Sequence, residues 1–112
     1  MKKRFAIPVE NDLLSSHFGH AKEFVFIDVV DNEIKEEKSL TPPPHEPGSL
    51  PRWISEMGAT DVLAGGLGQK AVSILNAHNI NVFTGVVSKD PKTLVEDFLK
   101  NNLELGGHQC DH

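Results

Sequence analysis

The sequence has little positive charge and no long apolar run, and each shortage excludes a class of protein. Among its 112 residues, 16 acidic side chains outnumber 11 basic ones, which gives a formal net charge of -5. Such a chain repels a phosphate backbone, so general nucleic-acid binding is not expected. Its apolar stretches are only a few residues long, whereas a membrane helix needs about 20 in succession. We therefore expect no membrane span and a cytoplasmic location.

Cysteine is also scarce, because Cys110 is the only one and cannot form an internal disulfide. It lies between His108 and His112, and in an extended segment the three side chains point to the same side. That arrangement suits a transition metal or a metal–sulfur cluster. It lacks the paired C-x-x-C spacing of a structural zinc site, so it could not fold a domain by itself. The alternative is that residues 106–112 form a flexible polar tail.

The remaining pattern predicts one α/β domain over residues 1–105, with the element order β-β-β-α-β-α-β-α. Strand patterns occur at Arg4–Val9, Glu23–Val30, Glu33–Leu40, Asp61–Ala64 and Asn81–Val87. Helix patterns begin after Ser49, at about Gln69 and after Asp90-Pro91. The second half alternates strand and helix, as parallel βαβ units do. We expect a five-stranded mixed sheet flanked by three helices.

A glycine-rich turn, Gly65-Gly66-Leu67-Gly68, follows the fourth predicted strand and opens a helix. Ligands of open α/β sheets bind beyond the carboxyl ends of the strands, where helix N-termini offer unpaired N–H groups. The turn is neither a Walker loop nor a complete dinucleotide fingerprint. It predicts an anion site, and the alternative is that the glycines only form a tight turn that requires positive φ.

Two histidines, His17 and His20, flank Gly19 in the loop after the first strand. Gly19 gives this loop freedom and Phe18 is expected to anchor it in the core, so one histidine could meet a ligand or a metal. The alternative is that both are solvated surface residues. We expect His45 and His78 at the surface and Trp53 in the core or an interface.

Residues for hydrolysis do not assemble in the pattern. There is no G-x-S-x-G elbow, and the first strand carries no carboxylate of the kind that a two-metal nuclease needs. A hydrolase would have to recruit Glu10, Asp12 or Asp28. The sequence favours a binding protein over an enzyme.

Three motifs in a fixed order resemble the dinitrogenase iron–molybdenum cofactor biosynthesis family, which includes the NifX and NafY carriers, the C-terminal domain of NifB and the orange protein. They are Ser16–Ala21, then His45–Gly48 with Leu50, Pro51 and Trp53, and finally Gly65–Gly68 with Ala71. The resemblance covers about residues 4–100. It implies a ribonuclease H-like fold, and binding and delivery of a cluster rather than catalysis.

The resemblance also implies a cargo and a set of binding residues. The cargo would be an anionic metal–sulfur cluster, either the iron–molybdenum cofactor or its precursor or a related molybdenum, iron or copper sulfide. The amides of Gly65, Gly66, Leu67 and Gly68 would hold it, with His17 or His20 as a side-chain ligand beside Gly19. His108, Cys110 and His112 would act as a lid. Cluster-assembly or acceptor proteins would be the partners. A small-anion or nucleotide-binding regulatory domain using the same turn is the alternative.

Overall fold

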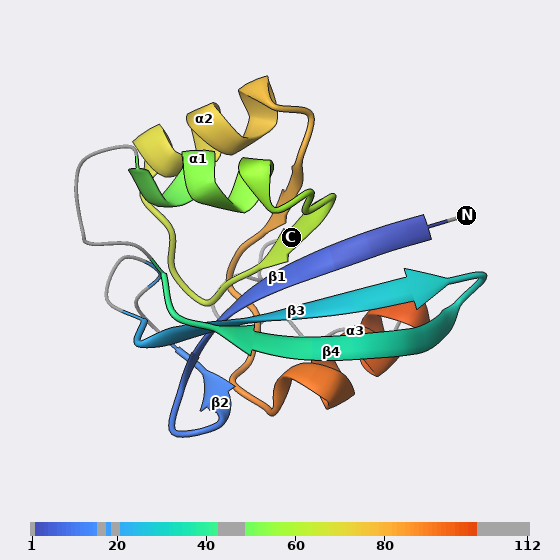
Figure 1. Ribbon diagram of the computed structural model, residues 1–112. Helices are drawn as coiled ribbons and strands as arrows, with labels where there is room; N and C mark the ends of the chain where they lie inside the picture. Colours follow the sequence, from blue (N-terminus) through green and yellow to red (C-terminus); the bar gives the residue numbers. More distant parts are fainter. Residues whose placement is uncertain (1, 16–17, 19–20, 43–48, 101–112) are drawn as a thin grey trace, which may run out of the picture.

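The described part of the chain forms one mixed sheet with helices on both of its faces (Figure 1). The computed structural model describes residues 2–15, 18, 21–42 and 49–100. Its strands are β1 (Lys2–Glu10), β2 (Leu13–Leu14), β3 (Glu23–Val30), β4 (Glu33–Leu40), β5 (Asp61–Leu63) and β6 (Asn81–Phe83). Its helices are α1 (Ser49–Glu56), α2 (Gln69–Ala77) and α3 (Pro91–Leu99).

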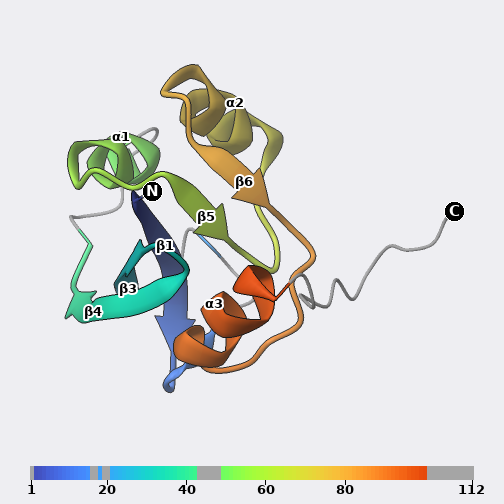
Figure 2. The ribbon, with the colours of Figure 1, turned by 90° about the vertical axis from the view of Figure 1, so that its right-hand side faces the viewer.

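The sheet has the strand order β4-β3-β1-β5-β6, and β2 pairs with the end of β1. Strands β1, β5 and β6 are parallel to one another, whereas β3 and β4 run antiparallel to their neighbours. Helices α1 and α2 cover one face and α3 covers the other, as Figures 1 and 2 show from two sides. The carboxyl ends of the three parallel strands therefore lie at one end of the sheet.

Alternate residues of the central strands supply two separate cores. Ala6, Phe24 and Phe26 face α1 and α2, while Phe5 and Ile27 face α3. All five are at least 96 % buried, since none exceeds 4 % exposure. Burial on both faces explains why β1 and β3 are nearly continuous apolar runs rather than alternating ones.

The expectation of five strands is wrong, because the sheet has six. After β1 the chain turns at Asn11 and Asp12, which both have positive φ (56° and 65°), and returns as β2. Two such residues form the tight turn that suits a β-hairpin. A two-residue strand is too short to give a periodic signal, so the turn residues were its only trace in the sequence.

The predicted strand over Asn81–Val87 is also too long, because β6 ends at Phe83. The chain turns at Gly85, whose φ is 74°. The edge strand β4 and its turn at Asp31-Asn32 are confirmed. Its exposed charged side chains protect this edge of the sheet from pairing with another strand. Helices in the described residues have at most nine residues, and none is long and apolar enough to cross a membrane.

Candidate functional site

The glycine turn lies at the carboxyl end of β5 and leads directly into α2. Two backbone hydrogen bonds join the start of this turn to the end of β6 and the residues after it. Ala64 N–H donates to the Phe83 carbonyl (2.9 Å), and Gly85 N–H donates to the Gly65 carbonyl (2.8 Å). Leu67 is half-buried and packs on the core beneath α2. Gly66 and Gly68 are exposed on either side of it. The turn is thus anchored from below and open to solvent above.

The alternative explanation of these glycines, a tight turn with positive φ, is wrong. The described glycines with positive φ are Gly58 and Gly85, and Gly65, Gly66 and Gly68 are not among them. Gly68 has φ -68° and ψ 153°, which any residue adopts, and a Cβ built there would have no heavy atom within 4 Å. Neither backbone strain nor packing requires glycine at position 68. Its effect is to leave the backbone uncovered.

The N-terminus of α2 also lacks the side chains that normally compensate it. Gly68 is the N-cap and provides no side-chain hydrogen bond, and the first turn contains no acidic residue but does contain Lys70. Within the described residues no hydrogen bond is made by the amides of Gln69, Lys70 or Ala71, and Val72 N–H is the first to bond, to the Gly68 carbonyl (3.1 Å). Free amides and the partial positive charge of the helix therefore face solvent together.

Helix α3 shows the usual arrangement by contrast. The Asp90 carboxylate accepts hydrogen bonds from Thr93 N–H (3.1 Å) and Thr93 Oγ1 (2.7 Å), and Pro91 occupies the first turn. These bonds, the hydroxyl first, lower the pKa of Asp90 below its ordinary value. The chain therefore caps α3 with its own anion and leaves the start of α2 open to an external one.

The loop between β2 and β3 is anchored at Phe18, as the sequence indicated. Phe18 is 5 % exposed, and its ring meets Phe24 edge-on at 5.4 Å between centroids. Phe24 pairs with Pro8 near the carboxyl end of β1. Phe18 and Leu67 pack in the same core. The anchor of this loop and the glycine turn therefore lie toward the same end of the sheet.

Most of the other predicted ligands fall outside the described residues. These are His17, Gly19, His20, His108, Cys110 and His112. His45, which was expected at the surface, also lies outside the described residues. His78 is exposed at the C-terminal end of α2, at the far end of that helix from the glycine turn. Trp53 is half-buried and meets Phe24 and Phe26 edge-on. The described residues contain no group of three or more His, Cys, Asp or Glu side chains that could hold a metal ion.

Sequence reasoning missed one residue of this site, Gly85. Its N–H fixes the Gly65 carbonyl, and its φ of 74° turns the chain away from the sheet at that point. The signal was the glycine itself near the end of a β-rich segment, which often marks a turn or a close backbone contact.

Comparison with known proteins decides the family. The model of the family described as "Dinitrogenase iron-molybdenum cofactor" matches residues 1–101. The chain belongs to this family. The resemblance based on the three sequence motifs is thereby confirmed, and the match spans every helix and strand described above.

Individual proteins are similar to this chain over most of its length. The structure of PH0822 is 34 % identical with a TM-score of 0.85, and the alignment covers 91 % of this chain and 93 % of that one. The apo form of the orange protein from Desulfovibrio gigas is 23 % identical with a TM-score of 0.78, covering 94 % and 93 %. MJ0580 of Methanocaldococcus jannaschii is 27 % identical over 106 residues, which are 90 % of this chain and 86 % of the relative.

Proposed function

We propose that this protein is a non-enzymatic carrier of an anionic metal–sulfur cluster, which it holds at the start of α2 during the assembly or delivery of the iron–molybdenum cofactor or a related cluster. Membership of the family supports the class of cargo. The observation that carries the proposal is the uncapped N-terminus of α2, which follows the three glycines and has no acidic residue in its first turn. We also infer the ribonuclease H-like fold that the family resemblance implies, and the mixed sheet with the order β4-β3-β1-β5-β6 supports this inference.

The proposed binding surface is made of backbone rather than side chains. The amides after Gly68 would donate hydrogen bonds to the sulfides of the cluster, and the helix dipole and Lys70 would offset its negative charge. Gly66 and Gly68 are exposed and present no side chain, so a bulky inorganic ligand could approach the backbone closely. Backbone amides bind an anionic cluster without reacting with it, so such a surface suits transport rather than catalysis.

Side-chain ligands would come from the loop that contains His17 and His20 and from residues 106–112. His17 and His20 flank Phe18, whose anchor is in the same core as Leu67. This shared core supports a loop position near the glycine turn. Imidazole and thiolate are suitable ligands for iron, copper and molybdenum sulfides, so His108, Cys110 and His112 would complete the set as a lid.

The test is cluster uptake by variants of the side-chain ligands. Apo protein would be prepared without oxygen and offered iron–sulfur and molybdenum–sulfur clusters, with the visible charge-transfer band as the readout. The triple variant His17→Ala, His20→Ala, Cys110→Ala should bind at least about tenfold more weakly, since even indirect ligand partners contribute that much. His78→Ala is the control, because it removes an exposed histidine at the opposite end of α2.

The outcomes separate a cluster carrier from a small-anion sensor. Loss of the cluster in the triple variant with normal binding by His78→Ala supports the carrier. Unchanged cluster affinity in the triple variant would contradict it. Binding of simple anions at the glycine turn, with no uptake of any cluster, would instead favour a regulatory anion-binding domain.

A further inference from the structure

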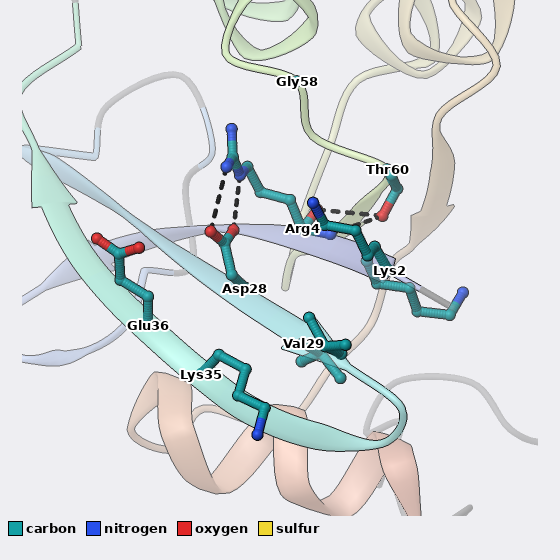
Figure 3. A pocket seen from close by; sticks show the side chains of 10 residues that line it. Lys2, Arg4, Asp28, Val29, Lys35, Glu36, Gly58 and Thr60 are labelled. Carbon is teal, nitrogen blue, oxygen red and sulfur yellow. Dashed lines mark hydrogen bonds and ion pairs between the residues drawn. The ribbon is translucent and has the colours of Figure 1, made fainter.

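A cavity lies where β1 begins, at the end of the sheet opposite the glycine turn. Figure 3 shows it from close by. Its volume is about 420 Å³, within the range of about 300–1,000 Å³ that is typical of small-molecule sites. The start of β1, the end of β3, the start of β4 and the turn after α1 line it. Because β1 and β5 are parallel, their beginnings share this end of the sheet.

Basic side chains are concentrated at this cavity. Lys2, Lys3, Arg4 and Lys35 line it, four of the eleven basic residues in the whole chain, whereas only two acidic residues, Asp28 and Glu36, do so. The chain as a whole has a formal charge of -5. The local balance is therefore opposite in sign to that of the protein, which favours an anionic ligand here.

Arg4 is held rigidly with part of its guanidinium still available. Nε and Nη2 donate to the two carboxylate oxygens of Asp28 (2.6 and 3.1 Å), and Nη1 donates to the Met57 carbonyl (2.6 Å). The Arg4 side chain remains 42 % exposed. A guanidinium has five N–H groups, so two are left after these three bonds. Such a fixed fork is suited to phosphate oxygens.

Lys2 provides a second positive charge that the neighbouring residues do not neutralise. Lys3 pairs with buried Asp61 (3.7 Å) and Lys35 pairs with Glu33 (2.9 Å), whereas Lys2 forms no ion pair within residues 2–15, 18, 21–42 and 49–100. The pKa of Asp28 is lowered chiefly by the Arg4 hydrogen bond, and Lys2 contributes a smaller electrostatic effect. Lys2 and Arg4 are two residues apart on β1 and both line the cavity, so they lie on the same face of the strand, where one ligand can contact both.

The backbone keeps this cavity open. Gly58 lies beside the guanidinium, and a Cβ there would be 3.2 Å from Arg4 Nη1. With φ of 82°, position 58 favours glycine on conformational grounds as well. The β3–β4 ladder shifts register between Asp28 and Val29, and the partly exposed Val30 adds apolar surface to the lining. The cavity thus combines a fixed cation with an apolar wall.

We propose that this cavity binds a small organic phosphate, with the phosphate on Arg4 and Lys2 and the organic part against Val30. Phosphate matches the two remaining N–H groups of a rigid guanidinium and a nearby ammonium. The volume exceeds that needed by a lone ion, so an organic group fits beside it. This site is separate from the glycine turn and does not depend on the carrier function.

The test is a titration of the full chain with phenyl phosphate, followed by the backbone amide resonances. We expect saturable shifts at Arg4, Gly58 and Thr60, which all line the cavity. Lys2→Gln should weaken binding about two- to fivefold, as removal of one exposed charge does. Lys92→Gln is the control, because it removes an equally exposed charge on α3.

Each alternative outcome identifies the step that fails. If Lys2→Gln and Lys92→Gln weaken binding equally, the phosphate is held by non-specific electrostatic attraction, and the proposed site is overturned. Shifts confined to Gly65–Gly68 would place the anion at α2 instead. Inorganic phosphate that binds as tightly as phenyl phosphate would overturn the contact of the organic group with Val30. None of these outcomes bears on the cluster-uptake experiment, because that experiment measures binding at the opposite end of the sheet.

Discussion

Replacing Gly68 by Asp would give α2 the cap that it lacks, and should change stability and binding in opposite directions. The backbone at Gly68 already has the extended conformation of an N-cap, with φ -68° and ψ 153°. A Cβ there meets no atom within 4 Å, so the new carboxylate has room to turn back onto the free amides. Asp90 already does this for α3 through Thr93.

The expected gain in the free energy of unfolding of the apo protein is about 1 kcal/mol. Asp is a better N-cap than Gly by a few tenths of a kcal/mol, and its charge gains about 0.3–1 kcal/mol from the helix dipole. Removing a glycine also restricts the unfolded chain by about 0.4–1 kcal/mol, and screening at this exposed site reduces the total. For a domain of this size, 1 kcal/mol corresponds to a rise in Tm of about 4 °C.

Cluster binding should weaken in the same variant by about fivefold or more, because the carboxylate occupies the amides and repels an anionic cargo. Thermal unfolding of the apo protein and titration with cluster measure the two effects. Ser73→Asp is the matched control, since it adds the same charge to an exposed position one turn further along α2. If Gly68→Asp binds cluster as the unmodified protein does, the start of α2 is not the binding surface.

Substitutions at three further positions test the fold around the two sites. Asp28→Asn should lower the free energy of unfolding by about 1 kcal/mol at neutral pH, because it breaks the bidentate pair with partly exposed Arg4. The folded-state pKa of Asp28 is below its ordinary value of 3.8, so its stabilisation is complete above that value and is lost as pH falls through the folded-state pKa. Urea unfolding at pH 7 and pH 3 should therefore show a smaller difference in stability between Asp28→Asn and the unmodified protein at the lower pH. Asp90→Ala should cost about 1 kcal/mol by exposing Thr93 N–H, and Asp90→Asn should restore most of it in the same assay. Phe24→Ala should cost about 3–5 kcal/mol and increase hydrogen exchange next to Phe18, and a cost below 1 kcal/mol would contradict the packing described.

Much of the fold follows from local signals in the sequence. The bounds of β3 and β4 were predicted to the residue, because apolar and charged runs and the Asp31-Asn32 turn mark them clearly. The start of α3 at Asp90-Pro91 and the glycine turn before α2 were found for the same reason. These features depend on residues that are close in sequence, where residue type alone carries the information.

The missed features depend on contacts between distant segments. The pair Arg4–Asp28 requires the exact register of β1 on β3, 24 residues apart, and the shift of β4 against Val29 changes which side chains reach the cavity. β2 is defined by pairing rather than by its two leucines. The uncapped state of α2 likewise emerges only from φ at Gly68 and the space around it, because glycine by itself fits both a strained turn and an exposed backbone.

The metal content of the purified protein distinguishes a carrier of a metal–sulfur cluster from a protein that binds none. The protein would be purified without oxygen and without a metal-affinity step, analysed for molybdenum, iron and copper, and examined by visible spectroscopy before and after cluster is offered. We expect the protein to contain stoichiometric metal, either as isolated or after loading with cluster, and to show a charge-transfer band. A colourless protein that takes up none of these clusters would contradict it.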